Sequence, residues 1–126
     1  MSTDQREIEW QFDADGLSEA RACLARVARR HGLTPGKAHV ETHHDTYFDT
    51  GDWRVYRAGY ALRLRLAAGA SNQPCELTLK SLSGAEKGLR QRREITETLE
   101  SVDLKDPAVA LLAAPGPVGE RARAMI

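Results

Sequence analysis

The sequence predicts an α+β fold in which an antiparallel β-sheet carries helices on its outer side. Several segments alternate polar and large apolar side chains with a period of two, which is typical of strands with one buried face. The first of them reads EIEWQF over residues 7–12. A segment at 17–31 repeats apolar residues at helical spacing and predicts an amphipathic helix. The length of 126 residues favours one domain, 1–126.

The elements follow one another along the chain with recognisable boundaries. Strands are expected over 7–12, 38–49, 60–66, 75–82 and 89–99. Helices are expected over 17–31, at 52–59 as a short turn or helix, from near 107, and from 118 onward, with polar loops at 67–74 and 83–88. Asp15 is in position to cap the first helix, and Gly32 is in position to end it.

Charge and composition exclude several classes of protein. The 18 basic and 18 acidic residues cancel, which argues against a general nucleic-acid or membrane-surface binder unless a local patch provides the charge. Neither a membrane nor a specific nucleic acid is expected as a partner. No apolar run approaches the length of a membrane span, and the first residues lack the apolar core of a signal peptide. Cys23 and Cys75 match no metal or redox spacing, so we expect free thiols in a cytoplasmic protein.

Sorting each expected strand by its period of two collects the polar side chains on one face. This face carries Glu7, Glu9, Gln11, Arg63, Arg65, Glu76, Thr78, Lys80, Arg90, Arg92, Glu94 and Thr96. Its charged members are five bases and four acids, with the acids leading on the first strand. Tyr47, which shares a strand face with His43 and Asp45, is expected to join them. The opposite face is apolar, and the helix at 17–31 is expected to cover part of it.

Paired carboxylates set against a cluster of bases suit a metal-bound polyphosphate. Carboxylate oxygens are hard ligands for Mg²⁺ or Mn²⁺, and arginine and lysine bind phosphate oxygens. The alternative is a solvated sheet face with weak cross-strand ion pairs, which is the better interpretation for any single residue. The same face pattern recurs in RLR, TLK and RQRRE, and this repetition favours a site for the set as a whole.

These motifs resemble the CYTH family, the triphosphate tunnel metalloenzymes. Glu7 and Glu9 match the E-x-E-x-K signature of its first strand, and Gln11 stands where lysine is usual. The segment DTYFDTGDWRVYRAGYALRLR resembles the family's second strand, short helix and third strand. ELTLKS and GLRQRREI resemble the two strands that follow, so that the resemblance covers the chain from about residue 7 to its end.

The resemblance implies both a fold and a chemistry. The fold is an antiparallel β-barrel, a triphosphate tunnel of about eight strands with a charged interior, of which about five are expected here. Members hydrolyse inorganic or thiamine triphosphate, or cyclise ATP, with Mg²⁺ or Mn²⁺. The resemblance implies that Glu7 and Glu9 hold metal and that Glu94 and Lys80 are catalytic. It implies that the substrate is bound by Arg63, Arg65, Lys80, Arg90 and Arg92.

Two departures from the family pattern affect these expectations. Gln11 removes a positive charge, and an amide binds phosphate more weakly than a cation does. The family's last strands would follow residue 126, so we expect the domain to be incomplete at its C-terminal end. Because unpaired strand edges invite strand addition, another chain or a swapped copy is expected to complete the barrel.

The leading hypothesis is therefore metal-dependent hydrolysis of a triphosphate, and inorganic triphosphate is favoured because no base-stacking pocket is evident in the sequence. One alternative is a non-catalytic module that binds polyphosphate or nucleotide, and another is an activity like that of class IV adenylate cyclases. A small OB-type barrel with its leucines inside would have a different fold. The two folds differ in which face of the sheet is enclosed. A tunnel encloses the charged side chains such as Arg63, Arg65 and Lys80, whereas a small barrel encloses Leu62, Leu64 and Leu66.

Overall fold

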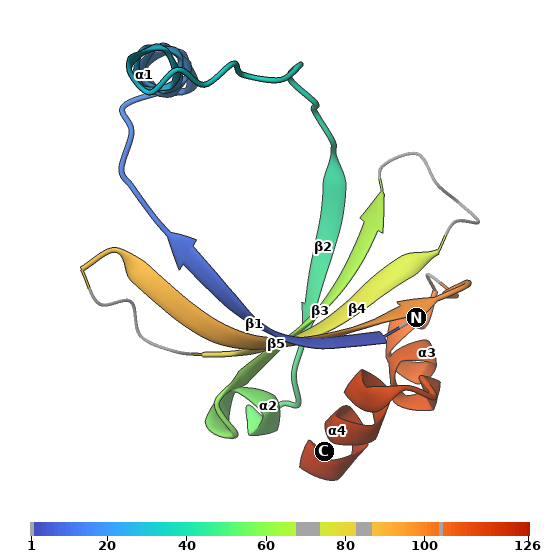
Figure 1. Cartoon of the computed structure of the whole chain (residues 1–126). Coiled ribbons are helices and arrows are strands. Elements are labelled where there is room, and N and C mark those ends of the chain that lie inside the picture. Colours follow the sequence, from blue (N-terminus) through green and yellow to red (C-terminus); the bar gives the residue numbers. More distant parts are fainter. Residues whose placement is uncertain (1, 68–73, 83–86, 104) are drawn as a thin grey trace.

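The computed structural model describes residues 2–67, 74–82, 87–103 and 105–126. These residues form one antiparallel sheet in the order β1-β5-β4-β3-β2 (Figure 1). The strands are β1 (Ser2–Trp10), β2 (His43–Phe48), β3 (Tyr60–Ala67), β4 (Cys75–Ser81) and β5 (Leu89–Leu99). Strands β1 and β2 lie at the two edges and do not pair with each other, so the described residues form an open, strongly curved sheet. The expected number of five strands is found, but a barrel is not confirmed.

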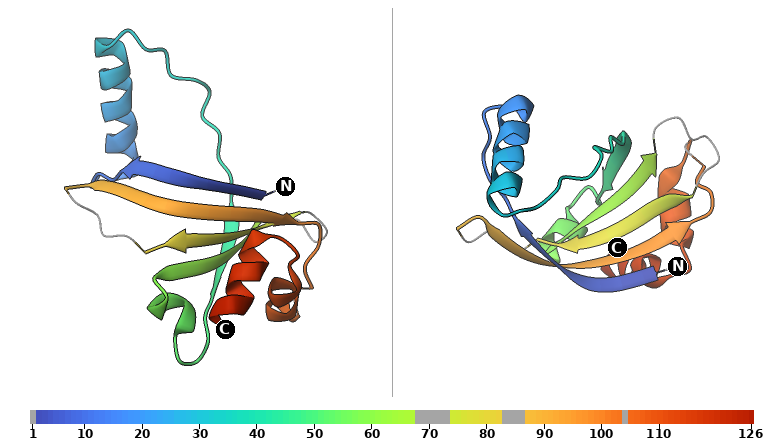
Figure 2. Two further views of the ribbon diagram at one scale, coloured as in Figure 1. Left: turned by 60° about the horizontal axis from the view of Figure 1, so that its bottom comes forward. Right: turned by 45° about the horizontal axis from the view of Figure 1, so that its top comes forward.

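Helices lie on both sides of this sheet but cover only its convex side. They are α1 (Leu17–Arg30), α2 (Arg54–Arg57), α3 (Pro107–Ala113) and α4 (Pro117–Met125). Figure 2 shows α2, α3 and α4 beneath the convex side of the sheet, whereas α1 stands apart on the concave side. The predicted α+β class is confirmed for the described part of the chain.

The hydrophobic core lies between the convex face of the sheet and helices α2 to α4. Its sheet layer consists of Leu62, Leu64, Cys75, Leu77, Leu79, Ile95 and Leu99. Its helical layer consists of Val55, Leu111, Ala114, Val118 and Ala122. Complete burial of one such leucine or valine side chain contributes about 1.5–3 kcal/mol, so this layer is the main source of stability.

Helix α1 does not cover the apolar face, and that expectation was wrong. No residue of α1 is buried, and its stripe of Leu17, Leu24 and Val27 faces solvent. The helical spacing did predict the helix itself, and Gly32, with φ of 66°, follows its end as expected. The cap prediction was also wrong, because Gly16 is the N-cap residue and Asp15 precedes it.

Several strand boundaries differ from the expected ones. Strand β1 begins at Ser2 and ends at Trp10, because the long β5 pairs with it residue by residue from Ser2–Glu97 to Trp10–Leu89. Phe12 lies beyond the strand, where its ring stacks on Trp10 with centroids 6.4 Å apart. Strand β2 covers only the second half of the expected 38–49. The loops expected at 67–74 and 83–88 fall largely outside the described residues.

A buried carboxylate fixes the last helix to the sheet. Glu97 of β5 points to the core side and is only 3% exposed. Its oxygens accept hydrogen bonds from the backbone N–H groups of Gly116, Val118 and Gly119, at 3.2, 2.8 and 3.1 Å. These N–H groups surround the start of α4 and have no partner within the helix. The N-cap residue, Gly116, has no side chain that could accept these hydrogen bonds. Glu97 therefore caps the helix in its place.

The two cysteines are free thiols, as the sequence predicts. Cys23 is exposed on α1, and Cys75 is buried in the core, where desolvation raises the pKa of its thiol. Among the helices of the described residues, none is both long and apolar enough to cross a membrane.

Candidate active site on the concave face

The cross-strand register brings the predicted site residues to one face. Glu7 lies opposite Arg92, Glu9 opposite Arg90, and Lys80 opposite Glu94. The charged face, as we call it, carries Glu7, Glu9, Asp45, Arg63, Arg65, Glu76, Lys80, Arg90, Arg92 and Glu94. Because the leucines on the other side of the same strands pack under the helices, the charged face lines the concave side of the sheet (Figure 1).

This arrangement decides between the two folds considered. A small barrel requires Leu62 and Leu64 to face a lumen, but both are buried against the helical layer outside the curve of the sheet. The charged side chains face the concavity instead, as a tunnel requires. The small-barrel alternative is therefore wrong, whereas the inward direction of the charged face is confirmed for the described strands.

The centre of the charged face is an ion-pair network across three strands. The ammonium of Lys80 on β4 lies 2.9 Å from a Glu94 oxygen on β5 and 3.2 Å from a Glu7 oxygen on β1. The guanidinium of Arg92 on β5 lies 2.6 Å from Glu9 and 3.4 Å from Glu7. Glu7 and Glu9 are therefore held by two bases, which relieves the repulsion between the two carboxylates.

Burial and charge act in opposite directions on Glu7. Desolvation by burial would raise the pKa of this carboxyl, but the hydrogen bond and charge of Lys80, together with the charge of Arg92, outweigh it, and the pKa of Glu7 lies below its usual range. Glu7 is thus held in its ionised form, which is the form that ligates a metal ion.

A second cluster lies where β2, β3 and β4 meet. The fork of Arg65 donates two hydrogen bonds of 2.7 Å to Asp45, and Arg63 lies 3.1 Å from Glu76. The hydrogen bond from Arg65 lowers the pKa of Asp45, and the same bond raises the pKa of Arg65. Sequence analysis placed Asp45 on a face with Tyr47 but did not assign it to the site. Its addition gives the charged face five acids and five bases, so the face is neutral.

Three arginines of the charged face have unused hydrogen-bonding capacity. The Nε–H groups of Arg63, Arg90 and Arg92 are buried and find no hydrogen-bond partner among the described residues. Unsatisfied buried donors are uncommon in folded proteins, and those on charged groups cost the most. An anion with several oxygens on this face would satisfy them.

The residues expected to hold metal fit it in donor type but not in number. Glu7, Glu9 and Glu94 offer the hard oxygen ligands that Mg²⁺ and Mn²⁺ prefer. No group of three or more His, Cys, Asp or Glu side chains converges in a metal-binding arrangement within the described parts of the chain. Lys80 and Arg92 lie against these carboxylates instead. Gln11 does not extend the site, because its amide donates to Glu9 at 3.1 Å and β1 has already ended.

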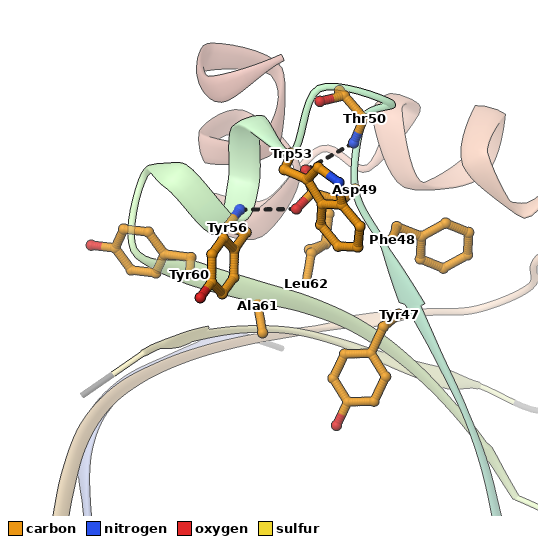
Figure 3. A pocket seen from close by; sticks show the side chains of 9 residues that line it. All are labelled: Tyr47, Phe48, Asp49, Thr50, Trp53, Tyr56, Tyr60, Ala61 and Leu62. Carbon is orange, nitrogen blue, oxygen red and sulfur yellow. Dashed lines mark hydrogen bonds between the residues drawn. The ribbon is translucent and has the colours of Figure 1, made fainter. Parts of the chain in front are cut away.

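A separate pocket of about 430 Å³ lies beside α2, between β2 and β3. Five aromatic residues line it: Tyr47, Phe48, Trp53, Tyr56 and Tyr60. Figure 3 shows the rings of Trp53 and Tyr56 on the α2 side of the strands, with Tyr47 pointing away from them. Ala61, which also lines the pocket, lies opposite Lys80 of the charged face, whereas Trp53 and Tyr56 lie on the convex side of the sheet (Figure 3). The sequence analysis did not identify this aromatic pocket.

Substitutions should separate anion binding from packing. We expect Arg65→Ala and Lys80→Ala to weaken tripolyphosphate binding by about 1.5–3 kcal/mol each, since each removes a charge-assisted hydrogen bond. Leu64→Ala should lower stability by about 2–5 kcal/mol and leave affinity unchanged, because Leu64 is buried on the opposite face. Calorimetry and thermal unfolding measure the two effects. Strong destabilisation by Arg65→Ala with unchanged affinity would remove Arg65 from the site.

Comparison with known proteins agrees with the geometry. The family model described as CYTH domain matches residues 5–122, which is nearly the whole chain. Neither the curated proteins nor the solved structures gave a significant match. The family match starts just before the paired carboxylates, and it extends from within β1 to within α4. The chain therefore belongs to the CYTH family.

Proposed function

We propose that the charged face binds a triphosphate together with Mg²⁺ or Mn²⁺ and that the chain contributes to its hydrolysis. The CYTH family is the triphosphate tunnel family, which covers triphosphatases and related activities, and its enzymes depend on metal. The observation that carries the proposal is the set of buried Nε–H groups on Arg63, Arg90 and Arg92, which lack partners among the described residues. They lie on the same face as Glu7, Glu9 and Glu94.

Charge balance explains why a metal belongs in this proposal. Five bases and five acids leave the charged face neutral, whereas a triphosphate carries several negative charges. A neutral face repays little of the cost of taking such an anion out of water. A divalent ion supplies additional positive charge and neutralises charge that develops on the phosphate oxygens.

Each residue then has a part in the reaction. Arg63, Arg65, Arg90 and Arg92 bind the phosphate oxygens and align the chain of phosphates for in-line attack by water. Lys80 neutralises charge that develops during transfer. Glu7 and Glu9 would hold the divalent ion through their carboxylate oxygens, and Glu94 orients the attacking water. In the hydrolysis the terminal P–O bond breaks, and water supplies the oxygen of the released phosphate.

The first test is an assay of the whole 126-residue chain. Tripolyphosphate with Mn²⁺ should bind, and release of inorganic phosphate should depend on the metal. Binding without release, in a sample whose sheet edges are paired by a second chain or a swapped copy, would favour the alternative, a non-catalytic polyphosphate or nucleotide module. The absence of both binding and release would contradict the proposal. The free thiols Cys23 and Cys75 are consistent with the cytoplasmic location that we propose for this activity.

Organic triphosphates are a second candidate, because Ala61 of the aromatic pocket lies opposite Lys80 of the charged face. A base or another ring in the pocket would stack on Trp53, which is 62% exposed. The family activities that fit are hydrolysis of thiamine triphosphate and a reaction like that of class IV adenylate cyclases.

Trp53→Ala distinguishes organic from inorganic triphosphate. If the pocket holds a ring, this change should lower the affinity for ATP by about 1–3 kcal/mol and leave that for tripolyphosphate unchanged, because stacking on an aromatic side chain is worth that much. Trp10→Ala is a matched control, since Trp10 is 61% exposed and lies outside the pocket. Equal affinity of wild type and Trp53→Ala for ATP would leave inorganic triphosphate as the preferred substrate.

Partners that complete the sheet form part of the proposal. The outer edges of β1 and β2 are unpaired in the described part of the chain, and such edges accept further strands. We expect substrate turnover only when a second chain, a swapped copy or a further segment pairs with them. Light scattering combined with the phosphate assay tests this. Turnover at an enzyme's usual rate by a strict monomer of 126 residues would show that further strands are dispensable.

A further inference from the structure

The ion-pair network places a protein cation where a metal ion would be expected. Lys80 extends from β4 across β5, and its ammonium lies between Glu94, at 2.9 Å, and Glu7, at 3.2 Å. The side chains of Lys80 and Glu94 are only 20% and 13% exposed, so this group is largely shielded from water. The ammonium thus holds together two carboxylates from neighbouring strands, as a divalent ion would.

Arg92 likewise holds Glu9, the second carboxylate of β1, next to Glu7. Its Nη2 lies 2.6 Å from Glu9 and 3.4 Å from Glu7, while its Nε–H is buried without a hydrogen-bond partner among the described residues. Arg92 therefore pairs with carboxylates through its Nη2, while its Nε–H has no hydrogen-bond partner among the described residues. The bases expected to bind phosphate and the acids expected to bind metal are paired with each other.

This pairing makes the binding of either ligand alone unfavourable. A divalent ion that binds Glu7 together with Glu9 and Glu94 displaces Lys80 and Arg92 from these carboxylates, which leaves two largely buried cations without their partners. An anion that draws Lys80 and Arg92 away leaves Glu7 and Glu94 close together and unneutralised. Breaking a shielded pair by removal of one partner is much more costly than exchange of both partners, because an uncompensated charge remains. When metal and polyphosphate bind together, the carboxylates pair with the metal and the bases pair with the phosphates. No buried charge is then left without a partner.

We propose that Lys80 and Arg92 are internal counter-cations that make the binding of divalent metal and of polyphosphate mutually dependent. The proposal rests on the proposed function and extends it to the regulation of the same site. Coupling of this kind is reciprocal, so the metal must raise the affinity for the anion by the same factor as the anion raises that for the metal. It restricts the charged face to metal–polyphosphate complexes and disfavours free metal and free phosphate.

The decisive experiment is titration of Mn²⁺ into the full chain without any phosphate, followed by calorimetry or by the electron paramagnetic resonance signal of free Mn²⁺. Lys80→Met removes the ammonium and keeps most of the apolar stem. We expect it to raise the affinity for Mn²⁺ alone by about 5–150-fold, the usual range for coupled sites. A residue that served only to bind phosphate would leave this affinity unchanged. Arg92→Met is a second variant and should act in the same direction through Glu9.

The matched control is Arg93→Met on the opposite face of β5. Arg93 forms an ion pair with Asp4 at 2.6 Å, outside the charged face, so its loss should leave Mn²⁺ binding as in the wild type. Circular dichroism verifies that each variant is folded. In the wild type, tripolyphosphate in excess EDTA should bind more weakly than the preformed Mn²⁺–tripolyphosphate complex, again by about 5–150-fold.

The possible outcomes separate this proposal from the proposed function. Stronger Mn²⁺ binding in Lys80→Met, with tight binding of the complex by the wild type, supports both. Unchanged or weaker Mn²⁺ binding in both Lys80→Met and Arg92→Met overturns the counter-cation role, while binding of the complex would leave the proposed function in place. Equal affinity of the wild type for tripolyphosphate with and without Mn²⁺ likewise overturns the coupling. Failure of the complex to bind overturns both.

Discussion

Replacement of Glu7 or Glu9 by glutamine should reduce the binding of Mg²⁺ or Mn²⁺, in the presence of tripolyphosphate, by at least about 10–100-fold. Loss of a group that only supports a metal ligand already costs this much, and these carboxylates are the expected ligands themselves. Metal-dependent phosphate release should fall in parallel. The fold should remain intact, because glutamine keeps the shape of these side chains, which are about one-third exposed, and because Lys80 and Arg92 each keep another carboxylate partner in either variant.

Asp4→Asn is the matched control for this pair of variants. Asp4 lies on the same strand but on the opposite face, where Arg93 neutralises it. The hydrogen bond from Arg93 lowers the pKa of Asp4, so it is ionised as Glu7 is. If Glu7→Gln and Glu9→Gln matched wild type both in the metal titration and in turnover, the carboxylate pair would have no role in metal binding.

Glu97→Ala should give the largest loss of stability among substitutions of charged residues. It removes a buried acceptor and leaves the N–H groups of Gly116, Val118 and Gly119 without their partner. Loss of a cap costs about 0.5–2 kcal/mol, and each buried donor left unsatisfied costs about 1–3 kcal/mol. We expect a total on the order of 3 kcal/mol, measured from urea unfolding midpoints.

Glu100→Ala serves as the control for Glu97→Ala, since Glu100 is an exposed glutamate three residues further on. Its loss should change the free energy of unfolding by no more than about 0.5 kcal/mol. Gly119→Ala offers a second test of the same junction, because a Cβ there would lie 2.1 Å from the carbonyl oxygen of Ala114. Equal unfolding midpoints for Glu97→Ala and Glu100→Ala would show that Glu97 does not fix α4.

The sequence predicted the charged face well because side-chain direction in a strand is a local property. A period of two assigned Lys80, Arg92 and Glu94 to one side of their strands, and the cross-strand register then brought them together. The leucines of β3 and β4 were assigned to the core for the same reason. A slip of one residue in the pairing would have placed the polar side chains of one strand beside the leucines of its neighbour. The charged face therefore depends on the cross-strand register as well as on the period of two.

Features that depend on tertiary packing could not be predicted in this way. The stripe on α1 indicated a buried face, but only the three-dimensional structure shows that helices α2 to α4 cover the leucines. Glu97 occupies an apolar-face position between Ile95 and Leu99, which was an overlooked sign of a buried polar contact, although its partners at 116–119 are distant in sequence. The aromatic pocket is likewise assembled from β2, α2 and β3, which no single motif contains.

Mapping of backbone amide chemical shifts on the isotopically labelled chain, with tripolyphosphate and diamagnetic Mg²⁺, tests the central claim most directly. We predict shifts concentrated at the inward positions of β1, β3, β4 and β5, including Glu7, Arg63, Lys80 and Arg92, and abolished by Arg92→Ala. Amides beside the buried leucines and on α1 should change little. Shifts confined to the convex face or to α1, or no shifts at all, would contradict the assignment of the concave charged face as the triphosphate site.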